Sequence, residues 1–402
     1  MNPSRIAARV RRIKPSPSTS AADRANDLRR QGKSIVNLVV GEPDFDTPAH
    51  IRQAAAAAMD KGQTRYTLMA GTVELRQAIV AKLERENGLT YAMNEIIATS
   101  GAKSAIYSAF AITLEPGDEV IIPAPYWVSY PDMVLASDGT PVTVACPEHN
   151  GFKLTPAQFE AAITPRTRWL LINSPSNPTG ASYTLDEYRA LAGVLAKHPH
   201  VLVMTDDIYE HIRFDGQRTP HFLEAAPELR ERTLIVNGVS KTYAMTGWRI
   251  GYVAGPRDLV QALDTLLSQS TGNCCSISQA AAAAALNGEQ SFVQTSVAIY
   301  KQRRDATFAR INAIPGLTCR APDGAFYLYV NCGGLIGKTT PEGKVLNEDV
   351  DFVMYLLESV GVAVVAGTAY GLSPYFRLSI ATSIEILEDG CARIARAVAA
   401  LR

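Results

Sequence analysis

Residues 237–251 have the sequence NGVSKTYAMTGWRIG and directly follow the apolar segment Thr233–Val236. The apolar segment predicts a buried strand, so Lys241 stands just beyond the end of that strand and Arg249 follows eight residues later. Taken alone, such a lysine can be a surface residue whose aliphatic stem packs on apolar neighbours. In α/β sheets, however, ligands bind beyond the carboxyl ends of the strands, so this position makes Lys241 a candidate functional residue.

Outward from this stretch, helices alternate with short apolar strands from residue 48 to about residue 275, which predicts an α/β fold with a mostly parallel sheet covered by helices on both faces. After about residue 290 the pattern changes to a long helix, short strands and two further helices, which predicts a smaller α+β domain. We expect a large domain over residues 46–290 and a small domain built from residues 291–402 together with residues 1–45 as an N-terminal arm. The predicted strands are Ile96–Thr99, Glu119–Ile122, Pro141–Ala145, Arg168–Asn173, Val201–Thr205, Thr233–Val236, Ile250–Ala254, Leu317–Arg320 and Ala325–Val330, and the predicted helices are Ala102–Leu114, Thr184–Lys197, Phe292–Ile314, Val350–Val360 and Ile384–Leu401.

Three more segments place polar residues at the end of a predicted strand. Residues 99–103 (TSGAK) join a strand to a helix whose free N–H groups could bind an anion, although many strand-helix turns look like this. Residues 173–180 (NSPSNPTG) form a turn in which Asn177 either caps the backbone or faces a ligand. Residues 201–209 (VLVMTDDIY) leave Asp206 where a buried strand ends, and a buried carboxylate requires a positive partner unless it caps a turn.

Composition excludes several classes of function. Lysine plus arginine equals aspartate plus glutamate at 39 each, so nothing indicates a nucleic-acid or acidic-membrane partner. The six cysteines form no CxxC pair, so no metal site is predicted, and no GxGxxG follows a strand. No apolar run approaches the roughly 20 residues needed to span a bilayer. The Arg-rich start, residues 1–17, lacks the apolar core of a secretory signal, so we expect a cytoplasmic protein with reduced thiols.

The four segments together match the needs of pyridoxal phosphate (PLP) chemistry, which are an amine, an anion for the pyridine nitrogen, a phosphate cradle and donors to the ring hydroxyl. The combination SKTYAMTGWRIGY (240–252), EPDFDTP (42–48), APYWVSYP (124–131) and SNPTG (176–180) resembles the class I aminotransferases of PLP fold type I. More closely, it is similar to the bacterial aspartate aminotransferases, including the aspartate/prephenate type. The resemblance extends from about Lys14 to Ser383.

The resemblance implies a set of cofactor-binding residues. Lys241 would hold PLP as a Schiff base and move the proton during catalysis. Asp206 would pair with the pyridine nitrogen and so make the ring an electron sink. The other implied contacts are Tyr209 and Asn177 to the 3-hydroxyl, Trp127 stacked on the ring, and Arg249 with the backbone of Gly101 and Ala102 on the phosphate, where Lys103 and Ser240 are further candidates.

The resemblance also implies substrate contacts. Arg377 would bind the substrate α-carboxylate, and Gly41 would lie over the substrate. Tyr66 matches a tyrosine that reaches a neighbouring subunit's phosphate, which implies a homodimer. Lys14 matches a lysine that contacts the distal acid in the aspartate/prephenate type, although it could equally be a solvated residue of a basic tail.

Two other sources of a distal cation are missing from the sequence. One branch of the family takes an arginine from the partner's loop, and the corresponding loop here, residues 268–276, holds no Arg or Lys. Another branch uses a lysine at a position that corresponds to Ala111.

We therefore expect an aminotransferase that acts on amino acids and 2-oxo acids, pairing aspartate or glutamate with 2-oxoglutarate, oxaloacetate or prephenate. Other PLP enzymes of the same fold, such as an aromatic or alanine aminotransferase or a C–S lyase, share the cofactor residues and remain alternatives, because function resides in the substrate pocket. A PLP-fold regulator fused to a DNA-binding module is disfavoured, since such a module needs roughly 60 further residues with a basic face.

Overall fold

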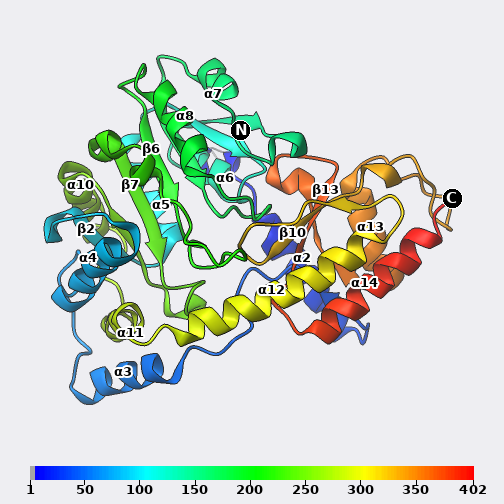
Figure 1. Ribbon diagram of the computed structural model, residues 1–402, viewed down its shortest axis with the longest axis horizontal. Helices are drawn as coiled ribbons and strands as arrows, with labels where there is room; N and C mark the ends of the chain where they lie inside the picture. Colours follow the sequence, from blue (N-terminus) through cyan, green and yellow to red (C-terminus); the bar gives the residue numbers. More distant parts are fainter. Residues whose placement is uncertain (1–4) are drawn as a thin grey trace.

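The computed structural model describes residues 5–402, so residues 1–4 of the expected N-terminal arm lie outside the described residues. A seven-stranded sheet forms the larger half of the molecule, on the left in Figure 1. Its strands stand in the order β2-β8-β7-β6-β5-β3-β4. Their bounds are β2 Ile96–Thr99, β3 Glu119–Ala124, β4 Thr140–Ala145, β5 Thr167–Asn173, β6 Leu202–Asp206, β7 Thr233–Gly238 and β8 Gly251–Ala254.

The sheet is mostly parallel, as the sequence predicts. The pairs β4/β3, β3/β5, β5/β6 and β6/β7 are parallel, and only β8 runs antiparallel, between β7 and β2. The reversal at β8 has a local cause, because the segment between β7 and β8 contains only turns and a short 3₁₀-helix, whereas a parallel return needs a longer crossover.

Alternate residues of each strand face opposite sides of the sheet and enter two separate cores. In β5, Leu170 and Ile172 join the core under α4, α8 and α11, while Trp169 and Leu171 join the core under α5, α6 and α10. The helices of the larger half are α3 Ala49–Asp60, α4 Val73–Asn87, α5 Ala102–Thr113, α6 Tyr130–Ala136, α7 Pro156–Ala162, α8 Leu185–Leu195, α9 Phe222–Ala225, α10 Arg257–Ser268 and α11 Ser276–Asn287.

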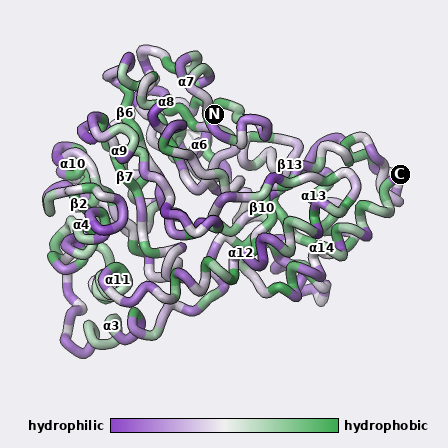
Figure 2. Tube along the Cα trace, viewed as in Figure 1, coloured by the Kyte–Doolittle hydropathy of each residue, from purple (hydrophilic) through white to green (hydrophobic). Residues whose placement is uncertain are grey.

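A four-stranded antiparallel sheet, in the order β12-β13-β10-β9, forms the second half with its own core. Helix α12 runs from beside α11 to this sheet, where it packs against α14 (Figure 1). Helix α14 buries one side only, and hydrophobic and hydrophilic residues accordingly alternate along it in Figure 2. The bounds are β9 Thr318–Cys319, β10 Tyr327–Asn331, β11 Val362–Ala363, β12 Val365–Ala366, β13 Tyr375–Ser379, α12 Ser291–Asn312, α13 Asp349–Val360 and α14 Ile384–Ala399.

The N-terminal segment contacts both halves. Helix α1 (Ala8–Arg12) packs on α6, whereas α2 (Pro17–Arg30) packs on β11 and β12. Strand β1 (Val36–Asn37) pairs in parallel with β11. The chain just beyond β1 therefore passes between the two halves before it reaches α3.

The predicted elements agree with the observed ones within three residues at each end. The helix expected over residues 102–114 is α5, and the strand expected over residues 201–205 is β6. Within residues 5–402, no helix is both long enough and apolar enough to cross a membrane.

Candidate active site

A cavity of about 630 Å³ lies where the carboxyl ends of β5, β6 and β7 meet β10, β13 and the segment after β1. Asn173 and Asp206 are the last residues of β5 and β6. The turn that carries Lys241, residues 239–245, follows β7 and is called the Lys241 turn below. Because parallel strands all end at the same edge of the sheet, residues far apart in the sequence meet there. Eleven of the fourteen predicted site residues line the cavity: Gly41, Ala102, Lys103, Trp127, Asn177, Asp206, Tyr209, Ser240, Lys241, Arg249 and Arg377.

The amine of Lys241 points into the cavity and donates a hydrogen bond to the carbonyl oxygen of Gly41 at 2.7 Å. Burial lowers the pKa of this amine to about 8. The nearby carboxylate of Glu42 opposes the shift, while the positive charges of Arg249 and Arg377 add to it. A substantial part of Lys241 is therefore the neutral, nucleophilic amine at slightly alkaline pH.

Asp206 is 4% exposed and accepts hydrogen bonds from the Tyr130 hydroxyl at 2.6 Å and from the backbone N–H of Ile208 at 3.4 Å. Burial raises the pKa of the Asp206 carboxyl to about 6, although the bond from Tyr130 works against the shift. Within residues 5–402 no cationic side chain forms an ion pair with it. A positive group in the cavity would therefore stabilise the carboxylate.

Arg377, in β13, is 2% exposed and has no ion-pair partner among residues 5–402. Its guanidinium donates to Asn177 Oδ1 at 3.0 Å and to the carbonyl oxygen of Val39 at 2.6 Å, and its Nε has no hydrogen-bond partner. The guanidinium carbon also lies 4.3 Å from the ring centre of Tyr327. A buried guanidinium that lacks a carboxylate suits a ligand that brings one.

Tyr209 and Tyr327 face each other with their hydroxyls 3.0 Å apart, and both are buried. Burial raises the pKa of Tyr209 and of Tyr327, so both phenols stay protonated. One hydroxyl donates to the other, which leaves the hydrogen of the second available to a ligand. The backbone N–H of Asn177 donates to Asn173 Oδ1 at 2.8 Å, which fixes the turn after β5.

The start of α5 and the Arg249 side chain form an anion cradle. Gly101 precedes α5 with φ +89°, and a Cβ at this position would stand 2.4 Å from an Arg249 Nη atom. Only glycine therefore allows this approach. Arg249, itself at φ +55°, donates to the carbonyl oxygens of Thr246 (2.9 Å) and Ser100 (3.3 Å). It has no ion-pair partner within residues 5–402, so its charge is available to an anion at the helix N-terminus.

Of the other three predicted residues, Gly101 forms the anion cradle, whereas Tyr66 and Lys14 lie outside the cavity. Tyr66 is 98% exposed, so it cannot serve the cavity of its own chain. Lys14 is exposed, and its backbone N–H donates to Asp132 at 3.0 Å. Ser16, two residues further on, does line the cavity.

Sequence reasoning missed Tyr130, Tyr327, Glu42 and Asn173. Tyr130 and Glu42 belong to the quoted motifs APYWVSYP and EPDFDTP, so those motifs could have indicated them. Tyr327 had no such signal, because it lies in an ordinary apolar strand and reaches the cavity only through the packing of β10.

Comparison with known proteins gives the family. The family model for aminotransferase class I and II matches residues 33–394. The chain belongs to this aminotransferase family. Among its relatives, the aspartate aminotransferase of Rhizobium meliloti (strain 1021) is 52% identical over 97% of this chain and 95% of its own length. The aspartate/prephenate aminotransferase of Cereibacter sphaeroides (strain ATCC 17029 / ATH 2.4.9) is 52% identical over 95% of this chain and 96% of its own length.

Solved structures agree with the sequence relatives. The crystal structure of the aspartate aminotransferase from Rhizobium meliloti covers all of both chains with a TM-score of 0.97 at 50% identity. The aspartate aminotransferase from Thermus thermophilus with maleate covers 98% of this chain and 100% of its own, with a TM-score of 0.92 at 40% identity. The fold is accordingly fold type I, and the chain is an aminotransferase.

Enzymes of this aminotransferase family use pyridoxal phosphate, and the residues of the cavity fit that group. The phosphate has a cradle at Gly101 and Arg249, where a side chain on residue 101 would collide. The pyridine nitrogen has a buried acid, Asp206, that lacks a cationic partner. The aldehyde has a half-buried amine of lowered pKa, Lys241.

Proposed function

We propose that this aminotransferase moves an amino group between aspartate or glutamate and a 2-oxo acid such as 2-oxoglutarate, oxaloacetate or prephenate. The observation that carries the proposal is the placement of the Lys241 amine in one cavity with the buried acid Asp206 and the unpaired, buried guanidinium of Arg377. The first two suit the cofactor, and the third suits the carboxylate that every amino acid and 2-oxo acid carries.

In this proposal, pyridoxal phosphate supplies an electron sink that stabilises negative charge at the substrate α-carbon. Arg249 and the N–H groups at the start of α5 hold the phosphate, and Asp206 holds the pyridine nitrogen. Tyr209 and Asn177 bind the ring hydroxyl, while Trp127, which lines the cavity, covers the ring. The Tyr130 hydroxyl fixes one oxygen of Asp206 and thereby orients the carboxylate.

Lys241 performs two tasks. Its neutral amine would hold the cofactor, and the same amine would move the proton at the substrate α-carbon. The carbonyl oxygen of Gly41 lies 2.7 Å from the Lys241 amine, so the segment after β1 contacts the atom that reacts.

Replacement of Asp206 by asparagine is expected to stabilise the cofactor-free protein at pH 8 but to weaken cofactor binding. Because burial raises the pKa of Asp206 to about 6, the folded protein loses stability as the pH rises through that value, and asparagine cannot ionise. We expect a gain of about 1–3 kcal/mol at pH 8, and little gain at pH 4, in urea unfolding without cofactor. Cofactor affinity should fall about 100-fold because the pyridine nitrogen of the cofactor loses its anionic partner. A variant that is less stable at pH 8 and binds the cofactor normally would contradict the assignment.

A four-carbon dicarboxylate needs a second cation. The cationic side chains that line the cavity are Lys103, Lys241, Arg249 and Arg377. Of these four, only Lys103 has no other contact in the proposal, and its ammonium lies 4.9 Å from the ring centre of Trp127. Lys103 and Lys14 are therefore the two candidates for the distal carboxylate. The Thermus thermophilus relative, an aspartate aminotransferase solved with the dicarboxylate maleate, supports a dicarboxylate substrate here.

The test of the proposed function is the visible spectrum of the purified protein. The cofactor band should bleach with aspartate and return when prephenate or 2-oxoglutarate is added. A C–S lyase would instead release pyruvate from a sulfur amino acid, and an aromatic or alanine aminotransferase would respond to its own amino donor. A band that aspartate leaves untouched would remove the acidic-substrate proposal.

The same half-reaction separates the two lysines. If Lys103 binds the distal carboxylate, Lys103→Ala should raise the half-saturating aspartate concentration about 10- to 100-fold and affect alanine, which lacks that carboxylate, far less. Lys14→Ala is the matched variant, and a larger effect there would assign the contact to Lys14.

We further propose a homodimer with a large domain of residues 46–290 and a small domain of residues 1–45 and 291–402. The two large sheets belong to different hydrophobic clusters, which supports this division, and the turn after β6 joins the cluster of the second sheet through Ile208, Tyr209, Ile212 and Phe214. The exposed Tyr66 and the nearby exposed Leu68, 59% accessible, support an interface with a second copy. The free cysteines, five of which are buried, agree with a cytoplasmic location.

A further inference from the structure

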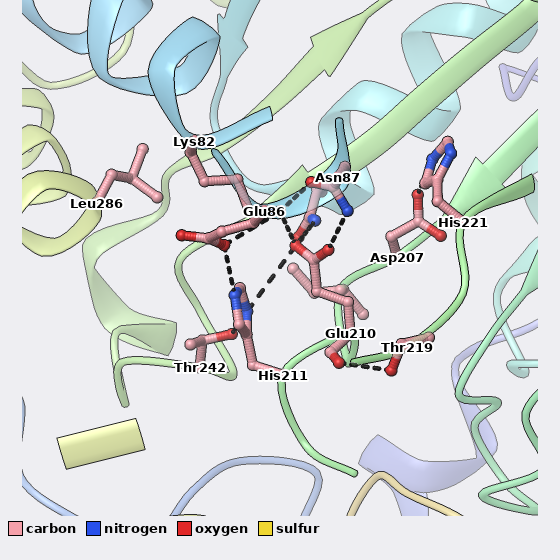
Figure 3. Close-up of polar contacts among 12 residues, drawn as sticks. Lys82, Glu86, Asn87, Asp207, Glu210, His211, Thr219, His221, Thr242 and Leu286 are labelled. Carbon is pink, nitrogen blue, oxygen red and sulfur yellow. Dashed lines mark hydrogen bonds and ion pairs between the residues drawn. The ribbon is translucent and has the colours of Figure 1, made fainter. Parts of the chain in front are cut away.

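A second cluster of charged groups lies behind the cavity, between α4 and the turns that follow β6 and β7. Figure 3 shows Lys82, Glu86 and Asn87 of α4 meeting Glu210 and His211. Lys82 is 1% exposed, and its ammonium donates to Asn87 Oδ1 at 2.8 Å and to Glu210 Oε1. It also lies 3.7 Å from a carboxylate oxygen of Glu86. A buried lysine ammonium therefore compensates the two carboxylates.

Glu210 is the centre of the cluster. Besides Lys82, it accepts hydrogen bonds from Asn87 Nδ2 at 3.0 Å and from Asn237 Nδ2 at 2.6 Å. Burial alone would raise the pKa of Glu210, but the charges of Lys82 and His211 and the hydrogen bonds outweigh it and lower the pKa. Glu210 is thus a fixed anion, and it directly follows Tyr209, which lines the cavity.

His211 uses both ring nitrogens. Nε2 lies 2.8 Å from a carboxylate oxygen of Glu86, and Nδ1 lies 3.0 Å from the hydroxyl of Thr242. A carboxylate only accepts, so Nε2 carries a hydrogen. The Thr242 hydroxyl can donate to a neutral ring or accept from a charged one, so this contact persists in both charge states of His211.

Thr242 is the residue after Lys241, and its hydroxyl is bonded to His211 while the side chain is buried. Asn237, at the end of β7, is held by Glu210 and accepts from the backbone N–H of Gly238 at 2.7 Å. The cluster thus holds the Lys241 turn at two points, one before and one after the lysine. Each of these points lies outside the cavity, so neither side chain contacts a ligand there.

We propose that Glu210 and His211 are positioning residues that act through Asn237 and Thr242 to fix the turn carrying Lys241. This inference rests on the proposed function, in which the Lys241 nitrogen binds the cofactor. The groups that face this nitrogen are Glu42, Asp206, Arg249 and Arg377. Burial is the largest cause that lowers the pKa of this nitrogen, and the opposing charges of Glu42 and Asp206 offset those of the two arginines. A loosened turn exposes the nitrogen to water, and that exposure favours its protonated form.

The test measures the pH midpoint of the visible spectrum of the holoenzyme, which reports protonation of the nitrogen that joins Lys241 to the cofactor. Thr242→Val keeps the shape of the side chain but removes the hydroxyl, and it should raise the midpoint by about half a pH unit or more. Thr242→Ser is the matched control that keeps the hydroxyl, and its midpoint should stay at the wild-type value.

Two substitutions of His211 separate its contacts. The amide of asparagine reaches the place of Nδ1, so His211→Asn retains the bond to Thr242 and should keep the midpoint near the wild-type value. The amide of glutamine reaches the place of Nε2, so His211→Gln retains only the bond to Glu86 and should shift the midpoint as Thr242→Val does. Combining His211→Gln with Thr242→Val should shift the midpoint little further than either variant alone, because both variants remove the same contact between His211 and Thr242.

Unchanged midpoints in Thr242→Val and His211→Gln, with lower melting temperatures alone, would overturn the proposal and leave the cluster a purely structural one. Additive shifts in the double variant would overturn the coupling through Thr242. Failure of the proposed function would give a different result, because the cofactor band of the wild-type protein would then be absent or would not respond to aspartate.

Discussion

Replacement of Lys241 by alanine is expected to lower kcat with aspartate by at least about 10⁴-fold, because the variant loses both the amine that binds the cofactor and the group that moves the proton. Absorption spectra and half-reaction rates of the purified variant measure the loss. The fold should be unaffected, since Lys241 forms no ion pair within residues 5–402 and only one hydrogen bond, to Gly41.

The control for this variant is cofactor retention without a covalent link. Asp206 and Arg249 are still present, so the variant should bind pyridoxal phosphate reversibly and show the spectrum of the free aldehyde. In the wild type, the pKa of about 8 implies that cofactor capture by the cofactor-free protein speeds up about tenfold between pH 7 and pH 9. Activity within tenfold of the wild type in Lys241→Ala would remove the lysine from the mechanism.

Replacement of Arg377 by methionine is expected to lower kcat/KM for aspartate by about 10²–10³-fold, because the substrate carboxylate loses a buried, charged hydrogen-bond partner. The same change should leave the stability of the unliganded protein unchanged or higher. The reason is that the guanidinium is buried without a carboxylate and with an unsatisfied Nε, so its removal ends a desolvation penalty that only substrate offsets.

Steady-state kinetics and thermal melting without ligands test both halves of this expectation. Cofactor affinity is the internal control, since the anion cradle is formed by Gly101 and Arg249 rather than by Arg377. A large loss of cofactor affinity, or an unchanged kcat/KM, would show that Arg377 does not bind the substrate carboxylate. Substantial destabilisation without ligand would show that its present contacts to Asn177 and Val39 are its main role.

Much of the site was predictable because it follows the ends of strands. Asn177, Asp206 and Lys241 each lie within a few residues of the end of a strand that the apolar pattern predicts, and parallel strands deliver their ends to one edge. The glycine at position 101 before a helix likewise indicated an anion site. Local sequence therefore predicted the large sheet and the cofactor side of the cavity.

The substrate side could not be derived in the same way. Arg377 lies in β13 of the second sheet, and from the sequence alone the alternative for it is a surface ion pair. Tyr327 belongs to an apolar strand that gives no sign of facing a ligand, yet its hydroxyl lies 3.0 Å from that of Tyr209. Both reach the cavity only because the second sheet packs across the end of the first.

The sequence by itself determined the order of strands and helices, the turn residues between them, and the family to which the motifs belong, since these depend on periodicity and on local backbone preferences. Only the tertiary structure decided which charges stay unpaired and which pKa values shift. Asp206, Lys241 and Arg377 are ordinary charged residues in the chain. Their reactivity comes from their placement in one cavity with reduced contact with water, which depends on the packing of the whole fold.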